Sequence, residues 1–378
     1  MLRVLQVIPT LDRSGAEKQL ALLAAGLPRD RFAVEVAALT RLGPLAAELR
    51  AAGIPVTPIG KRLKVDPFAL GRLTRLMKAG RFDVVQTWIF AANVYGRIAA
   101  RRAGVPIVVT AEMAVDLWKG RAQLAIDRYL ARTTDRVVGN SNAVVDFYRD
   151  RAGVPESRLA MIPSGIDDAE GIAPPAGFDP AATRRSLGLP PSGPLAIFVG
   201  RLAEQKGVAD LIDALDIVQH VEPDLRTLIV GDGPLRDRLR SVASAYTLDD
   251  RVKFLGHRDD AAHLIGLADV LILPSLYEGL PNVVLEAMRR SKPVIATAAP
   301  GTTEVVLPGV TGVLVPIRRP PILAAALRDL IRDPDRARSL GQAGRARVDA
   351  EFGSRAMIDR FATLYEDLAR SKGLLPRD

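Results

Sequence analysis

Short apolar runs rich in β-branched residues alternate along the chain with longer amphipathic stretches. Strands of a parallel sheet are buried on both faces, whereas the helices that cover the sheet keep one wet side, so this alternation predicts doubly wound α/β domains. In the first half, the runs that predict strands are residues 3–8, 34–39, 54–56, 84–86, 107–110, 137–138 and 160–162. In the second half, they are residues 195–199, 227–230, 252–255, 270–273, 294–296 and 313–315.

The two series of strands are separated by a segment, residues 164–194, that is rich in glycine and proline. Glycine and proline interrupt this segment too often for it to form the core of a sheet, and such composition is typical of a connection between domains. A length of 378 residues also suits two domains of about 150–200 residues each. We therefore expect an N-terminal domain over residues 1–175, a C-terminal domain over residues 176–355, and a cleft between them. Ligands of such sheets bind beyond the carboxyl ends of the strands, which directs attention to the loops that follow them.

Composition narrows the class of protein only slightly. Hydrophobic residues make up 48% of the chain and charged residues 25%, as in ordinary globular proteins. No apolar run reaches the roughly 18 residues that a membrane span needs, and the N-terminus lacks the features of a signal peptide. The chain has no cysteine, which excludes disulfides and thiolate chemistry. We expect a soluble, cytoplasmic protein.

Charge is distributed unevenly, and the whole basic excess lies in the first half. Residues 1–165 carry 25 Lys and Arg against 14 Asp and Glu, whereas the remainder has a net charge of −2. This asymmetry favours an anionic partner for the first domain, either a phosphate-bearing acceptor or an anionic membrane face; the alternative is an ordinary solvated surface. Nucleic acid is disfavoured as a partner because the basic residues form no recognisable binding module.

One segment of the first half combines basic and apolar residues at helical spacing. Lys61-Arg62-Leu63-Lys64 precedes a predicted helix over residues 67–79, in which apolar positions are interleaved with Arg and Lys. Such a helix can lie on an anionic membrane. The same pattern is typical of an ordinary helix that covers a sheet and keeps one side wet, and we prefer that interpretation.

The loop after predicted strand 195–199 reads Gly200-Arg201-x4-Lys206-Gly207. Glycine lets a backbone approach a ligand closely, and the Arg fork and the Lys ammonium both suit a diphosphate. Basic residues in loops are usually only solvated, so this loop by itself is weak evidence for a site.

A second loop, after predicted strand 270–273, carries two glutamates. Glu278 lies beside Gly279 in the loop, Asn282 is predicted to cap the following helix, and Glu286 lies about one turn into that helix. Backbone N–H groups of the loop and the helix N-terminus predict an anion site, and the two carboxylates suit sugar and ribose hydroxyls. The alternative is an ordinary turn residue followed by a first-turn helix glutamate.

Taken together, Gly200-Arg201-x4-Lys206-Gly207 followed by Glu278-x7-Glu286 resembles the family 4 glycosyltransferases, which are retaining enzymes of GT-B architecture. Further matches cover nearly the whole chain and comprise Ser14-Gly15-Ala16-Glu17, Asn140-Ser141, Ile162-Pro163-Ser164-Gly165-Ile166-Asp167 and Val230-Gly231-Asp232-Gly233-Pro234. The resemblance implies two Rossmann-like domains that face a cleft. It also implies that a C-terminal helix, within residues 356–378, crosses back to pack on the N-terminal domain.

The resemblance further implies a role for each matching residue. Glu278, Arg201 and Lys206 would be the catalytic set, with Arg201 and Lys206 on the donor diphosphate and Glu278 on the transferred sugar. Glu286 would hold the ribose, His257 would lie near the nucleobase, and Gly15 would approach the phosphates from the other domain. The remaining donor-binding residues would be Gly279, Leu280, Pro281, Asn282 and Val283. The family generally needs no metal and no cofactor beyond the nucleotide sugar; accordingly, Asp333-Pro334-Asp335 is interpreted as a turn and helix cap.

The sequence departs from the family pattern in the first half. Many members carry a histidine after the strand that matches 84–86 or the one that matches 107–110, whereas all three histidines here lie in the second half. The acceptor-side candidates at these positions are Trp88 and Glu112, although Glu112 could equally be a plain surface or cap glutamate. A front-face transfer, in which the leaving phosphate takes the acceptor proton, needs no enzymic base.

The expected function is therefore retaining transfer of a hexosyl group from a nucleoside-diphosphate sugar, with UDP favoured and GDP next. A polyprenyl-linked glycan, another lipid or a polysaccharide of the cell envelope would be the acceptor. One alternative is a sugar-nucleotide 2-epimerase, which would need acid and base histidines that the first half lacks. Another is a non-catalytic sugar-nucleotide-binding protein, which the fold permits. A dehydrogenase is excluded because no Gly-x-Gly-x-x-Gly follows a first strand.

Overall fold

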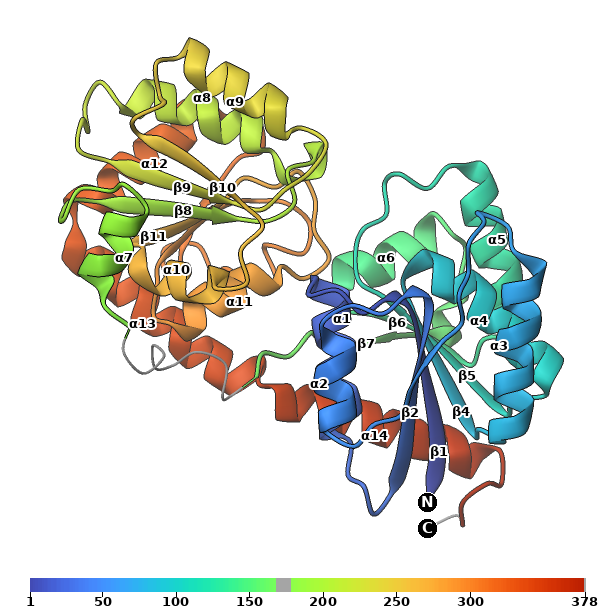
Figure 1. Ribbon diagram of the computed structural model, residues 1–378. Coiled ribbons are helices and arrows are strands. Elements are labelled where there is room, and N and C mark those ends of the chain that lie inside the picture. Colours follow the sequence, from blue (N-terminus) through green and yellow to red (C-terminus); the bar gives the residue numbers. More distant parts are fainter. Residues whose placement is uncertain (168–177, 377–378) are drawn as a thin grey trace. The chain divides into compact units, whose positions relative to one another are not determined.

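The computed structural model describes residues 1–167 and 178–376, which fall into two compact units (Figure 1). The first unit comprises Met1–Asp167 and Gly353–Asp378, and the second comprises Asp168–Phe352. The boundary predicted between residues 175 and 176 lies outside the described residues and stays a prediction.

The first unit is built on a seven-stranded parallel sheet with the order β3-β2-β1-β4-β5-β6-β7. Its strands are β1 (Leu2–Thr10), β2 (Phe32–Arg41), β3 (Val56–Pro58), β4 (Val84–Trp88), β5 (Ile107–Glu112), β6 (Arg136–Gly139) and β7 (Leu159–Met161). The strand order reverses between β1 and β4, and this switch point is where a doubly wound sheet opens to ligands.

Helices cover both faces of the first sheet (Figure 1). They are α1 (Gly15–Gly26), α2 (Leu45–Ala51), α3 (Pro67–Gly80), α4 (Ile89–Ala103), α5 (Arg121–Ala131), α6 (Asn142–Asp150) and α14 (Ser354–Ser371). Apolar residues of α1, α2 and α14 form one core cluster with the sheet, and those of α3 and α4 form a second. In α3, Leu73 and Met77 are buried in that second cluster, which confirms the preferred interpretation of this helix as a sheet cover.

The C-terminal helix α14 belongs to the first unit, as predicted, although it begins at Ser354 rather than within residues 356–378. Its Tyr365 lies in a buried polar chain. Gln6 Nε2 donates to the Tyr365 hydroxyl at 3.2 Å, the Tyr365 hydroxyl donates to Gln86 Oε1, and Trp88 Nε1 donates to Gln6 Oε1 at 2.7 Å. These bonds join α14 to β1 and β4 and fix its position on the sheet.

The second unit repeats the plan with a six-stranded parallel sheet in the order β10-β9-β8-β11-β12-β13. Its strands are β8 (Leu195–Val199), β9 (Arg226–Val230), β10 (Val252–Gly256), β11 (Val270–Leu273), β12 (Val294–Thr297) and β13 (Val313–Val315). Its helices are α7 (Pro180–Ser186), α8 (Val208–Val218), α9 (Arg236–Ala245), α10 (Ala261–Leu267), α11 (Asn282–Arg289), α12 (Pro320–Arg332) and α13 (Pro334–Glu351). The strand order reverses between β8 and β11.

Among the predicted strands, the third differs most from the structure. Residues 54–56 were expected, whereas β3 covers Val56–Pro58. Ile54 N donates to Leu49 O of α2, which ties Ile54 to the preceding helix, and pairing with β2 begins only at Val56. None of the described helices is long and apolar enough to cross a membrane.

Candidate active site

The loop after β8 is locked against the loop after β11, at the switch point of the second sheet. Gly207 has a φ of +61°, and an added Cβ would overlap the carbonyl oxygen of Pro274, so only glycine fits. Leu276 N donates to Gln205 O at 2.8 Å, and Gln205 Nε2 donates to Tyr277 O at 2.9 Å. These contacts hold two segments that are 72 residues apart in the sequence in a fixed arrangement.

Lys206 and Glu278, both predicted as site residues, form an ion pair across these two loops. Lys206 Nζ lies 2.6 Å from Glu278 Oε1, and the Ser275 hydroxyl donates to the same oxygen at 2.6 Å. Glu278 is buried and Lys206 is partly buried. A buried carboxylate needs hydrogen-bond partners in place of water, and Lys206 and Ser275 supply them at the carboxyl end of the strands.

The backbone from Gly279 to Pro281 is braced from the other side by the loop after β12. Glu278 N donates to Pro300 O at 3.1 Å. Gly301 has a φ of +79°, and an added Cβ there would overlap the carbonyl oxygen of Gly279. Gly279, Leu280 and Pro281 are buried as a result, which keeps the cradle rigid.

Helix α11 begins at Asn282, which corrects the prediction that Asn282 is its N-cap. Pro281 occupies the N-cap position with an extended ψ of 101°, and no side chain there accepts a capping hydrogen bond. Val283 follows Asn282 in the first turn, and Glu286 lies on the helix face that is buried against the unit. Glu286 is therefore not an exposed first-turn glutamate.

Of the other predicted donor-side residues, Arg201 shares the loop after β8 with Lys206, whereas His257 and Gly15 lie elsewhere. Arg201 is exposed and forms no ion pair with any residue in 1–167 or 178–376. His257 follows β10, is exposed, and has its Nε2 3.6 Å from Asp259 Oδ1. Gly15 begins α1 of the first unit, where the hydroxyls of Thr10 and Ser14 both donate to Glu17. Their roles as donor contacts stay predictions.

Asp333 caps a helix, as the sequence indicated. Its Oδ1 accepts from Arg336 N at 2.9 Å at the start of α13. Over the two described ranges, no three His, Asp or Glu side chains gather in a way that could hold a metal ion.

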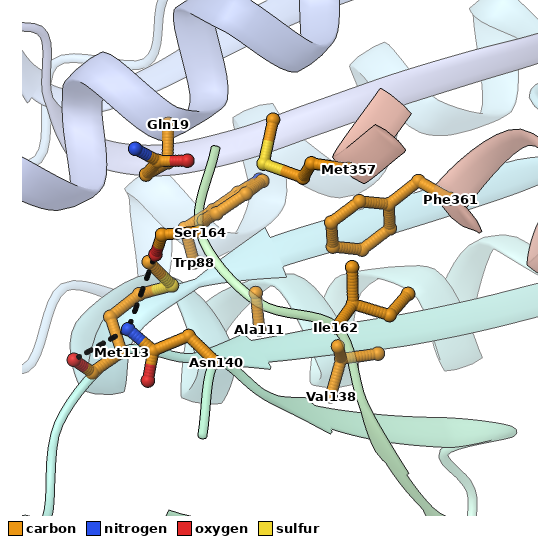
Figure 2. Close-up of a pocket in the computed structure, with 10 residues that line it drawn as sticks. All are labelled: Gln19, Trp88, Ala111, Met113, Val138, Asn140, Ile162, Ser164, Met357 and Phe361. Carbon is orange, nitrogen blue, oxygen red and sulfur yellow. Dashed lines mark hydrogen bonds between the residues drawn. The ribbon is translucent and has the colours of Figure 1, made fainter. Parts of the chain in front are cut away.

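Trp88, one of the two acceptor-side candidates, is the last residue of β4 and is buried. Its indole N–H donates to Gln6 Oε1. Its ring lines a cavity of about 10 Å³. Asn140 and Ser164 line the same cavity (Figure 2). Asn140 Nδ2 donates to Met113 O and to Ser164 Oγ, each at 3.3 Å. A cavity of this volume holds no more than one water molecule, so Trp88 has a packing role beside any acceptor-side role.

Glu112, the other acceptor-side candidate, ends β5 with only 1% of its surface exposed. This corrects the alternative that it is a plain surface or cap glutamate: it belongs to a buried charge cluster. Lys119 Nζ lies 3.8 Å from Glu112 Oε2, 3.0 Å from Asp116 Oδ2 and 2.9 Å from Asp127 Oδ2. Arg97 Nη2 pairs with Asp127 Oδ1 at 2.7 Å. Burial raises the pKa of Glu112 to about 7, with Asp127 and Asp116 acting in the same direction and Lys119 opposing.

The partners of Glu112 were not among the residues predicted from the sequence. Arg97 lies in the buried stripe of α4 between Ala92 and Ala99, and Asp127 lies in the buried stripe of α5. A charged residue at a buried helical position needs a partner of opposite charge, and this signal could have indicated the cluster.

Comparison with known proteins shows the family to which the chain belongs. The family model described as Glycosyltransferase Family 4 matches residues 13–170, and the one described as Glycosyl transferases group 1 matches residues 180–347. The chain belongs to the family 4 glycosyltransferases. The first model matches most of the first unit of this glycosyltransferase. The second model matches most of the second unit, including the loops that carry Lys206 and Glu278.

Individual relatives are similar over most of their length. A UDP-Gal:alpha-D-GlcNAc-diphosphoundecaprenol alpha-1,3-galactosyltransferase of Escherichia coli is 27% identical over 366 residues, with 92% of each chain covered. An alpha-D-kanosaminyltransferase of Streptomyces kanamyceticus is 29% identical over 289 residues, covering 74% of this glycosyltransferase and 75% of the relative. The crystal structure of Anabaena HepE in complex with UDP-glucose superposes with a TM-score of 0.85 at 25% identity, over 97% of this chain and 100% of that one. The two Rossmann-like units thus have the GT-B fold.

Proposed function

We propose that this glycosyltransferase moves a hexosyl group, with retention of configuration, from a nucleoside-diphosphate sugar to a lipid-linked glycan or polysaccharide acceptor in cell-envelope glycan biosynthesis. The Lys206–Glu278 pair inside a rigid backbone cradle is the observation that carries this proposal. UDP is the favoured nucleotide, because the Escherichia coli relative is named for UDP-Gal and HepE was solved with UDP-glucose. GDP is next.

In this proposal the loop after β8 binds the donor diphosphate and the loop after β11 binds its sugar. Lys206 and the exposed Arg201 neutralise the phosphate charge, so the reaction has no need of a metal or other cofactor. Glu278 accepts hydrogen bonds from sugar hydroxyls. Glu286 does the same for the ribose, and the backbone of residues 279–283 completes the cradle. Gly15 and His257 add contacts to the phosphates and to the nucleobase.

The proposed chemical step needs no base from the protein. The bond between the anomeric carbon and the diphosphate oxygen breaks, and the acceptor oxygen bonds to the same face of that carbon. The acceptor proton passes to the leaving diphosphate oxygen. The positive charges of Lys206 and Arg201 lower the barrier because they stabilise negative charge that develops on the diphosphate. This route agrees with the absence of histidine from residues 1–219 of the sequence.

The test measures nucleoside diphosphate released from UDP-, GDP- and ADP-sugars, with and without EDTA. Wild type should release it from at least one donor, and Lys206→Ala or Glu278→Gln should lower kcat by ~100-fold or more, as is usual when a charged transition-state contact is lost. Glu204→Gln is the matched control, because Glu204 is exposed on the same loop as Lys206 and should keep full activity.

Other outcomes separate the alternatives. A sugar-nucleotide-binding protein would show a donor-dependent rise in melting temperature without turnover. An epimerase would convert the donor without releasing nucleoside diphosphate. The coupling constant of the anomeric proton in the product reports retention, and an inverted product contradicts the front-face step.

We also propose peripheral contact with an anionic membrane at the cytoplasmic face, through the turn that precedes α3 and the first turn of that helix. Leu63, Val65 and Phe68 expose 65%, 76% and 81% of their surfaces. Asp66 holds this turn: its Oδ1 accepts from Ala69 N at 2.9 Å, and its own N–H donates to the Tyr95 hydroxyl at 2.6 Å.

Basic residues 61, 62 and 64 flank these apolar side chains, a combination that suits an anionic lipid surface. The protein should sediment together with vesicles rich in phosphatidylglycerol at low salt, and it should not sediment with phosphatidylcholine vesicles. Phe68→Ser should weaken this binding. Ile322→Ser, a change at an exposed apolar residue of the second unit, should not.

A further inference from the structure

An aromatic pair joins the start of α4 to the loop after β5, two segments that leave neighbouring strands of the first sheet. Phe90 lies in the first turn of α4, directly after β4, and Trp118 lies in the loop between β5 and α5. Their rings are edge to face, with centroids 5.3 Å apart and an interplanar angle of 88°. Because Trp88 of β4 pairs with Ala111 of β5, both segments leave the carboxyl edge of the sheet, where ligands of such folds bind.

The Trp118 indole is exposed and yet firmly held. It exposes 56% of its surface. Its N–H donates to Asp116 Oδ1 at 3.0 Å, and the Lys119 ammonium lies 5.9 Å from its ring and 4.9 Å from that of Phe90. Since the one polar group of the indole is occupied, the side chain presents an apolar ring surface to any ligand.

Lys119 fixes the loop between β5 and α5 through its buried side chain. Its side chain is fully buried, and besides its three carboxylate neighbours it donates to the Tyr148 hydroxyl and lies 4.7 Å from the Tyr148 ring. An exposed tryptophan would ordinarily sample several rotamers, so a fixed orientation lowers the entropy that is lost when a ligand binds.

Backbone strain marks the start of α4. Ile89 has a φ of +56°, a left-handed conformation that is rare for a β-branched residue and is unfavourable. It lies directly between buried Trp88 and Phe90, at the switch point of the sheet. Strain of this kind persists where the surrounding structure imposes it, most often at ligand sites.

We propose that Trp118, backed by Phe90 and positioned by Lys119, is a stacking platform for a sugar ring of the acceptor. The inference rests on the proposed function, because it assigns the acceptor side of that same reaction. A pyranose has a face of C–H groups that packs on an apolar ring. An anionic lipid surface suits this place less well, because the carboxylate of Asp116 accepts from the indole N–H and the ammonium of Lys119 is fully buried and paired.

A binding experiment tests the platform without turnover. Saturation-transfer NMR is recorded on methyl glycosides of glucose, galactose, mannose and N-acetylglucosamine, with UDP present. At least one glycoside should receive saturation from the wild-type protein. The same glycoside should receive none from the Trp118→Leu variant but should receive it from the Trp118→Phe variant. Tyr129→Leu is the matched control, since Tyr129 is a similarly exposed aromatic residue, at 57%, on α5. Absence of saturation in wild type, or saturation that persists in Trp118→Leu, overturns the platform.

Kinetics provide a second test, with the methyl glycoside that receives saturation as the acceptor and the sugar nucleotide that is turned over as the donor. Trp118→Leu should raise the KM for the acceptor by about tenfold or more, while kcat and acceptor-independent donor hydrolysis change less than about twofold. Lys119→Met should act in the same direction and should increase acrylamide quenching of Trp118. If Trp118→Leu leaves the acceptor KM unchanged but abolishes vesicle sedimentation, Trp118 is a lipid contact and the platform is wrong. If wild type turns over no donor, the proposed function fails, whereas the NMR result still decides the platform.

Discussion

Replacement of Glu112 by Gln should stabilise the first unit at alkaline pH. Glu112 is buried, and its Oε1 accepts no hydrogen bond from any residue within 1–167 and 178–376. When Glu112 is protonated, the cluster holds two cations, Lys119 and Arg97, against two anions, Asp116 and Asp127. When it ionises, a third anion remains in a site with little water, which is unfavourable.

The sign and size of the effect follow from the pKa. Burial raises the pKa of Glu112 from 4.5 to about 7 in the folded state. Since the folded state holds this proton more tightly than the unfolded state, the contribution to stability is complete below pH 4.5 and is lost as pH rises through 7. One pKa unit corresponds to about 1.4 kcal/mol, so the loss amounts to roughly 3 kcal/mol. Gln keeps the shape and never ionises, so Glu112→Gln should escape this loss.

Urea unfolding followed by tryptophan fluorescence provides the assay. The sequence contains two tryptophans, Trp88 and Trp118, and both lie in the first unit, so the signal reports that unit selectively. The free energy of unfolding of Glu112→Gln, minus that of wild type, should rise by about 2–3 kcal/mol between pH 5 and pH 8. Glu156→Gln, at an exposed site of the same unit, is the control and should show no such trend. A difference that stays constant over this pH range would refute the reasoning.

Substitutions at three further positions test how the loops and helices are held. Gly301→Ala should place a Cβ against the carbonyl oxygen of Gly279 at a φ of +79°, so donor affinity measured by calorimetry should fall by about tenfold or more; unchanged affinity would show that the cradle is not rigid. Tyr365→Phe should lower the unfolding free energy of the first unit by about 1–3 kcal/mol in the fluorescence assay, because it breaks the buried chain that joins α14 to the sheet. Asp333→Ala should cost about 1 kcal/mol in calorimetric unfolding of the second unit, since it removes the side chain that accepts from Arg336 N, whereas Asp333→Asn should cost less.

Much of the fold followed from the sequence because strand and helix signals are local. Three predicted strands, residues 195–199, 270–273 and 313–315, agree with the structure residue for residue. The misplaced third strand shows where local signals fail: Ile54 is apolar and β-branched, but a hydrogen bond to Leu49 holds it outside the sheet. The order of the strands in each sheet depends on contacts between distant segments and was visible only in the structure.

The loops that carry the candidate donor residues were also predicted from the sequence, since they directly follow strands. The sequence placed Lys206 and Glu278 on those loops, and the structure adds that they pair at 2.6 Å and that two glycines make the cradle rigid. The predicted start of α11 was wrong by one residue. Asparagine is a common N-cap residue, but Pro281 occupies the N-cap position here and Asn282 is the first residue of the helix.

The sequence by itself determined the family, the two α/β units and the loops on which charged residues would lie, because motifs and periodicity are properties of neighbouring residues. Only the tertiary structure decided what those residues do in the first unit. Trp88 and Glu112 were both placed at strand ends by sequence, but whether a side chain there faces solvent or the interior depends on the helices packed over it. Arg97, Lys119 and Asp127 meet around Glu112 because α4, α5 and the loop after β5 converge there, and no spacing along the chain contains that information.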